Sequence, residues 1–200
     1  DPATAPTLAA ASDTGISNSD AITNLTSNMT VTGTITADAT YAQEVDLYDG
    51  ATLVTTVSVA AGQTTYTFSN LSFTPGAHAL TVKVRDIANN SSAAASPTLN
   101  LSVDTTAPTL GVTNVVGSNA YIDLPFSEGL YSTSTPPAAA IVQPGAFTIT
   151  NTGAITVSIQ CIKTTTAVGC GAGNDVVAGT STVRAFLSIT GTVTGTESIT

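Results

Sequence analysis

The stretch Met29-Thr30-Val31-Thr32-Gly33-Thr34-Ile35-Thr36-Ala37 decides the fold class of this chain. Apolar or small residues hold its odd positions and threonines its even ones, as in a strand with one buried face and one hydroxyl face. The same alternation returns at Leu80-Val82-Val84 and Leu99-Leu101-Val103, and Asp49-Gly50 is a two-residue hairpin signal. About seven such strands fit into the first hundred residues, which predicts an all-β, two-sheet sandwich.

A repeated pentapeptide sets the domain organisation. Thr4-Ala5-Pro6-Thr7-Leu8 returns unchanged as Thr106-Ala107-Pro108-Thr109-Leu110, an interval of 102 residues. This period is too long for a solenoid repeat of roughly 20–50 residues and has the size of a whole domain. We therefore predict two tandem sandwich domains, residues 1–103 and residues 104–200, and expect the second to be incomplete at its carboxyl end.

The composition narrows the functional classes. Only 8% of the residues are charged, with 4 Lys+Arg against 13 Asp+Glu, for a net charge of −9. The hydrophobic share of 42% and the mean hydropathy of +0.30 favour a folded chain over a disordered one. So few cations argue against nucleic acid and anionic membranes as partners, whereas the acidic balance suits divalent cations. No apolar run reaches the roughly 18 residues of a membrane helix.

The two cysteines, Cys161 and Cys170, flank a loop rich in threonine and glycine. Neither belongs to a CxxC or Cys/His zinc pattern, so we predict a hairpin disulfide and with it an oxidising, extracellular environment. A pair of reduced, buried thiols is the alternative.

Several motifs in order carry a family resemblance over residues 1–108. They are Ser12-Asp13-Thr14-Gly15, Ser19-Asp20-Ala21-Ile22-Thr23-Asn24, Val31-Thr32-Gly33-Thr34, Val45-Asp46-Leu47-Tyr48-Asp49-Gly50, Pro75-Gly76-Ala77-His78-Ala79-Leu80-Thr81-Val82, Arg85-Asp86-Ile87-Ala88-Asn89-Asn90 and Val103-Asp104-Thr105-Thr106-Ala107-Pro108. In this order and spacing the chain resembles the bacterial immunoglobulin-like repeats of giant surface adhesins. The resemblance implies tandem immunoglobulin-like sandwiches on the bacterial cell surface, which act as extracellular spacers and are often stiffened by calcium.

The resemblance also implies a metal site at the end of a domain. Calcium takes six to eight oxygen ligands, and carboxylates in neighbouring loops of a sandwich can supply them. The matching positions are Asp13, Asp20, Asp86 and Asp104. The alternative is that these side chains only cap turns through bonds to nearby backbone amides.

The second unit resembles a different bacterial sandwich repeat. The segment Asn119–Leu130 holds Phe126-Ser127-Glu128 at an expected strand end, and Gly145–Thr150 reads as a short strand with Phe147. Alternation continues in Ile155-Val157-Ile159-Cys161 and in Val183-Ala185-Leu187-Ile189, which predicts two further strands.

Catalysis finds little support in the sequence. His78 is the sole histidine and begins a predicted strand, where a solvated or edge position suits it better than the role of a general base. No Gly-x-Ser-x-Gly elbow is present, so we predict no enzymatic activity. Carbohydrate binding is a minor alternative, because the chain has no Trp to form an aromatic platform.

Two structural roles remain as alternatives. The chain is either part of the stalk of a large adhesin, whose ligand on a cell or matrix is bound by other parts, or a subunit of a surface polymer such as a filament, sheath or S-layer. In the polymer, a strand from a neighbouring copy would complete the second sandwich. The extended segment Thr4–Ala11 is the predicted donor of that strand.

Overall fold

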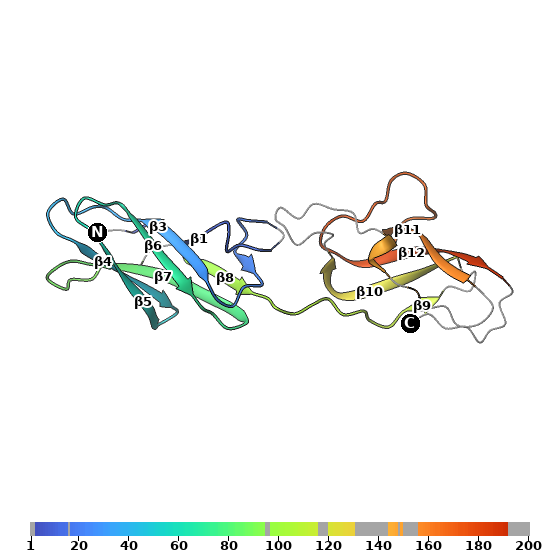
Figure 1. The fold of residues 1–200 in the computed structure, drawn as a ribbon, viewed down its shortest axis with the longest axis horizontal. Coiled ribbons are helices and arrows are strands. Elements are labelled where there is room, and N and C mark those ends of the chain that lie inside the picture. Colours follow the sequence, from blue (N-terminus) through green and yellow to red (C-terminus); the bar gives the residue numbers. More distant parts are fainter. Residues whose placement is uncertain are drawn as a thin grey trace. The chain divides into compact units, whose positions relative to one another are not determined.

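A computed structural model describes residues 3–15, 17–94, 97–115, 120–130, 144–147, 149 and 156–191. The chain divides into two compact units, the first spanning Asp1–Thr106 and the second beginning at Ala107 (Figure 1). Strands form three sheets, which confirms the all-β prediction. Among the described residues, no helix has the length and hydropathy to cross a bilayer.

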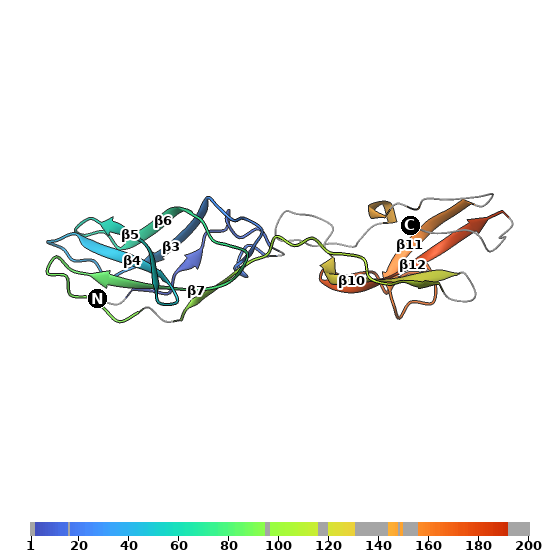
Figure 2. The same cartoon turned by 90° about the horizontal axis from the view of Figure 1, so that it is seen from below.

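The first unit has two layers of β-sheet (Figure 1 and Figure 2). One sheet has three strands in the order β1-β3-β6, with the bounds Thr7–Leu8, Met29–Thr34 and Thr65–Leu71. The other has five strands in the order β2-β8-β7-β4-β5, with the bounds Ile22–Thr23, Leu99–Val103, Gly76–Arg85, Gln43–Asp49 and Thr52–Val59. Most neighbours are antiparallel, but β2 runs parallel to β8.

The core of the first unit lies between these sheets and follows the period-two pattern. Met29 and Val31 of β3 are fully buried, as are Val45, Leu47 and Leu80 on the facing sheet. Burial of these aliphatic side chains is the main source of stability for such a fold. The inward faces predicted from the alternation are confirmed.

The repeated pentapeptide forms the first pairing of each unit. In the first unit Thr7 pairs with Thr32 and Leu8 with Val31, both antiparallel. In the second unit Leu110 forms an antiparallel bridge with Phe126. The segment Thr4–Ala11, which is the predicted donor of a strand to a neighbouring copy, pairs with β3 of its own unit in this structure.

Tyr66 holds the repeated segment against β6. Its ring lies over Gly33, where an added Cβ would come within 2.1 Å of the phenol oxygen. The hydroxyl donates a hydrogen bond to the Thr4 carbonyl at 3.3 Å, and burial raises the pKa of Tyr66 to about 12. Only glycine at position 33 leaves room for this contact.

The chain enters and leaves the first unit at opposite ends. Thr4 donates its amide to the Thr34 carbonyl, at the end of the sandwich where β7 finishes with Arg85. Val103 pairs with Gly76, at the end where β7 begins. The ten residues of β7 separate the two points by about 30 Å, since a strand rises about 3.3 Å per residue.

The described part of the second unit contains one sheet in the order β11-β12-β10-β9. The bounds are Thr156–Thr164, Thr180–Thr190, Tyr121–Leu130 and Asn114–Val115. The strand predicted to end at Phe126-Ser127-Glu128 continues to Leu130, and the two alternating segments form β11 and β12 as predicted. A 3-10 turn, η1, covers Pro144–Ala146, where the sequence predicted the start of a strand.

A bulge changes the inward face of β11. Its register against β12 shifts between Ile159 and Cys161. The extra residue reverses the alternation, so that Val157 and Ile162 are both buried although five positions separate them. Phe147 and Ile149 pack against this core, while the rest of the predicted Gly145–Thr150 strand lies partly outside the described residues.

Two leucines on neighbouring strands test the core assignment. Leu47→Ala should lower the free energy of unfolding by about 2–5 kcal/mol, because its side chain is fully buried and its removal leaves a cavity. Leu53→Ala, at a side chain that is 51% exposed, should change it by less than about 0.5 kcal/mol. Urea unfolding at low protein concentration measures both, and equal effects would contradict the assigned core.

Candidate functional site

Asp13 is the most unusual carboxylate of the first unit. It lies in the loop between β1 and β2 and is only 1% exposed. Its Oδ2 accepts a hydrogen bond from the amide of Ala21 at 2.9 Å, whereas its Oδ1 is buried with no hydrogen-bond partner. Burial raises the pKa of Asp13, the Ala21 amide lowers it, and neighbouring Asp20 raises it further, for a net upward shift. Such a group is costly unless something compensates its charge.

The loop around Asp13 is held by several independent contacts. Asp20 accepts hydrogen bonds from the amides of Ser17 at 3.2 Å and Ile22 at 3.1 Å. Gly15 donates to the Ile22 carbonyl, and an added Cβ on Gly15 would lie 2.7 Å from that oxygen. Ala21 has a φ of 59°, a left-handed value that is unfavourable for alanine. This strained residue directly follows Asp20 and donates its amide to Asp13, so contacts with the rest of the loop hold a conformation that alanine alone does not favour.

The other two predicted metal ligands each cap a turn. Asp104 follows β8, and its Oδ1 accepts the Thr106 amide at 2.9 Å. Asp86 binds Asn90 with both oxygens, accepting from the backbone amide and from Nδ2 at 2.8 Å each. These bonds lower the pKa of Asp86, with the Asn90 side chain the largest cause. At these two positions the contacts that the structure shows are those of turn-capping side chains.

The topology separates Asp86 from the other three aspartates. Asp104 lies beside β2, where its amide donates to the Thr23 carbonyl, and so at the same end of the sandwich as the loop of Asp13 and Asp20. Asp86 follows the far end of β7. Within the described ranges no three His, Cys, Asp or Glu residues form a group that could hold a metal ion. The pair of Asp13 and Asp20 is therefore the part of the predicted set that the structure brings together.

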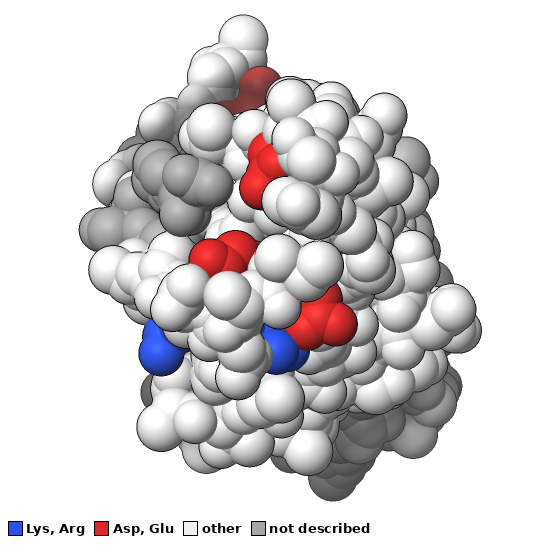
Figure 3. Space-filling model, turned by 90° about the vertical axis from the view of Figure 1, so that its left-hand side faces the viewer, with Lys and Arg blue, Asp and Glu red and all other residues white. Residues whose placement is uncertain are grey.

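Ion pairs that the sequence did not reveal lie at the end of the first unit where the chain enters. Arg85 binds the buried Asp46 through Nε at 2.6 Å and through a second nitrogen at 3.0 Å, and it also reaches Glu44 at 2.8 Å. The hydrogen bonds from Arg85 are the largest cause of a lowered pKa of Asp46. Figure 3 looks onto this end and shows acidic and basic side chains side by side. Arg85 and Glu44 also line a hollow of about 320 Å³ with Asp86 and Asn89.

All four cationic side chains of the chain have partners in their own unit. Besides Arg85, Lys83 lies over the ring of Tyr48 at 4.9 Å. Lys163 pairs with Asp175, and Arg184 binds Asp123 with two nitrogens. No cluster of unpaired cations is therefore present to attract a polyanion.

His78 forms bonds through both ring nitrogens. Nδ1 lies 2.7 Å from an oxygen of Asp49, and Nε2 lies 2.8 Å from the Thr74 carbonyl. Since both partners are acceptors, the imidazolium form satisfies both bonds. With no free ring nitrogen in this arrangement, the side chain has no position from which to accept a proton from a nucleophile.

Cys161 and Cys170 form a disulfide, with the two Cα atoms 5.8 Å apart. The bridge joins β11 to the loop before β12, as the sequence predicted. Val168 in this loop is almost completely exposed. The same loop supplies Val176, which is fully buried in the core of the second unit, and the buried Ala167.

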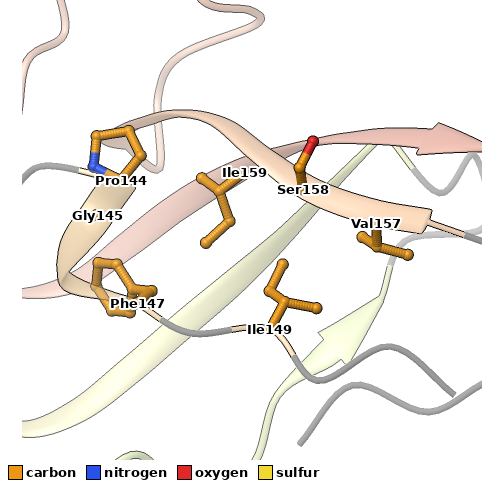
Figure 4. A pocket seen from close by; sticks show the side chains of 7 residues that line it. All are labelled: Pro144, Gly145, Phe147, Ile149, Val157, Ser158 and Ile159. Carbon is orange, nitrogen blue, oxygen red and sulfur yellow. The ribbon is translucent and has the colours of Figure 1, made fainter.

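Figure 4 shows an apolar hollow of about 310 Å³ in the second unit. Phe147 and Ile149 line it from one side, and Val157 and Ile159 of β11 line it from another. Among the described residues of its lining, Ser158 is the one polar side chain. The described lining thus has one aromatic ring and one polar side chain, whereas a sugar site commonly uses aromatic platforms and several polar groups.

The first unit is a two-sheet β-sandwich whose loops hold carboxylates and no catalytic arrangement within the described residues. The family model described as bacterial Ig-like domain matches residues 2–105, just over half of the chain, and the chain belongs to this family. The resemblance seen in the sequence is thereby confirmed. A search of curated proteins and a search of solved structures returned no match. Such domains are typically not enzymes, and they often occur in extracellular or surface proteins, which is compatible with a structural extracellular role.

The pH dependence of stability tests the arrangement around His78. Burial lowers the pKa of His78, but the Thr74 carbonyl and the Asp49 carboxylate raise it by more, so its net shift is upward from 6.5. A raised histidine pKa adds stability that is full below pH 6.5 and is lost as the pH rises through the folded-state pKa. The free energy of unfolding should therefore fall across this window. In His78→Gln the fall should be absent, and an unchanged pH profile in this variant would contradict the ion pair.

Proposed function

We propose that the chain is a spacer segment in the stalk of a large bacterial surface adhesin. In this role, Ig-like units strung end to end hold a binding part, located elsewhere in the protein, away from the cell. The observation that carries the proposal is the entry of the chain at one end of the first unit, beside Thr34, and its exit at the other, beside Gly76. An array of units joined in this way becomes longer with every added copy.

The repeated pentapeptide supports the same role. Because Thr4–Leu8 and Thr106–Leu110 each make the first pairing of their unit, the segment that leaves one unit is also the first structural part of the next. This leaves a short link between units, which favours a stiff array. The disulfide and the scarcity of lysine support an extracellular location.

The polymer alternative is weakened by the same pairing. A donor strand from Thr4–Ala11 would have to leave β3, to which Thr4, Thr7 and Ala9 are hydrogen-bonded. Strand exchange would thus break a pairing before making an equivalent one. A filament, sheath or S-layer built from this chain needs another contact between copies.

Calcium fits one pair of carboxylates. Asp13 and Asp20 would hold the ion, since Asp13 Oδ1 is buried without a partner and the neighbouring Asp20 helps to raise the pKa of Asp13. A bound divalent cation would supply the missing positive charge and fix the loop beside Asp104, where the chain leaves the unit. Asp86 at the far end of the sandwich would not take part in this site.

Solution scattering from tandem copies tests the spacer role. Copies of residues 4–105 joined directly keep the natural 102-residue interval. The maximum dimension should grow in proportion to the number of copies, by at least about 30 Å each, because β7 alone has ten residues. A maximum dimension that grows much more slowly than the number of copies would contradict the spacer role.

The same tandem copies test the proposed calcium site separately from the spacer role. Calcium should raise the melting temperature and stiffen the array, and a chelator should reverse both effects. In Asp13→Asn both responses should disappear, whereas Asp86→Asn should keep them. Superimposable curves with calcium and with chelator would refute the metal site and leave the spacer role standing.

A further inference from the structure

The two sheets of the first unit expose two very different flanks. On one flank the edge strands are β1 and β2, with two residues each. Pro6 precedes β1, and the amide of Gly15 covers the Ile22 carbonyl on the outer side of β2. Short edges, prolines and covering loops are the usual means by which proteins prevent edge-to-edge pairing.

The opposite flank lacks short edge strands, prolines and covering loops over most of its length. Its edge strands are β5, with eight residues, and β6, with seven, and neither has a further strand beyond it in the described part of the unit. From Gly50 to Leu71, a range that spans both edge strands, the sequence has no Asp, Glu, Lys, Arg or His, and neither strand contains a proline. Leu53 is 51% exposed and Val54 is also exposed.

Hydrogen bonds fix which backbone groups of β5 point outward. Gly50 donates to the Ala79 carbonyl, so the even-numbered residues of β4 bond to β7 and the odd-numbered ones bond to β5. The register joins these odd-numbered residues to Thr55, Val57 and Val59. A register shift disturbs the ladder only before Thr55, at the level of Leu47 and Tyr48.

The amides and carbonyls of Thr56 and Ser58 therefore face away from the sheet. They lie in the regular part of the strand, and an edge with such groups is a template for another strand. Their side chains are exposed as well. The Thr56 hydroxyl is already used, since it donates to Asp46 at 2.6 Å.

We infer that the outer edge of β5 is a pairing surface for β5 of a second copy of this chain. Two copies, each with a net charge of −9, repel one another over most of their surfaces, but the edge strands β5 and β6 contain no charged residue. A two-fold axis makes the contact self-complementary, and the antiparallel ladder that results is the stronger kind. In this pair Thr56 of one copy lies opposite Ser58 of the other.

This contact goes beyond the spacer role and does not depend on it. An antiparallel pair suits stalks that approach one another from opposite directions, as on two facing cells. The partner is a second copy, and association through Val168 or Ile87, both exposed apolar side chains outside this flank, is the competing outcome.

Amide hydrogen exchange of the 200-residue chain at low and at high protein concentration tests the inference without a variant. The amides of Thr56 and Ser58 should exchange about tenfold more slowly at high concentration, because pairing protects them. Those of Thr55 and Val57 should be protected at both concentrations by β4. Equal rates for Thr56 and Ser58 at both concentrations would overturn the inference.

Variants then locate the contact by sedimentation. Ser58→Pro removes an outward donor at an edge position that tolerates proline, and Leu53→Glu adds a negative charge beside the pairing edge. Both should shift the chain toward the monomer at every concentration. Ile87→Glu, which adds the same charge at a side chain that is 72% exposed in the β7–β8 connection, should leave association unchanged. Loss of association in Ile87→Glu alone would assign the contact elsewhere.

Discussion

The burial of one apolar face of each sheet against the other is the interaction on which the first unit depends. With 8% charged residues, the chain has few ion pairs to add, and the aliphatic rows of β3, β4, β7 and β8 provide most of the stabilisation. The repeated segment closes this core, because Leu8 is buried within it and Tyr66 ties Thr4 to the sheet. The sequence that links units is therefore also part of the fold of each unit.

The few charges are placed where they do not compete with this core. Arg85 and its carboxylate partners lie at one end of the sandwich, and Asp13 and Asp20 lie at the other. Between the ends, the β5–β6 flank is uncharged and relies on hydroxyl and amide groups for solubility. An uncharged flank leaves backbone groups as its main means of recognition.

The strands and their buried faces were predictable from the sequence because a period of two reflects burial directly. The loops were not, since their geometry depends on which strands become neighbours. Asp86 matched the family pattern like Asp13 did, but β7 separates the two, and only the topology shows this. Arg85 and Asp46 are 39 positions apart in the sequence and lie on different strands, so no local pattern indicates that they pair.

Two further features were hidden for a related reason. The bulge in β11 comes from its pairing with β12, so the alternation through Cys161 predicted the wrong inward residues after Ile159. The left-handed backbone of Ala21 is held by the Asp13 carboxylate, although alanine itself does not favour that conformation. Both cases show long-range contacts overriding the preference of a single residue.

The central claim is that this chain is a structural segment displayed outside the bacterial cell. Labelling with an antibody raised against the folded 200-residue chain tests it most directly, on intact and on permeabilised cells of a bacterium that carries the gene. We expect equal labelling of intact and permeabilised cells, and loss of the label after protease treatment of intact cells. Labelling that appears only after permeabilisation would contradict it.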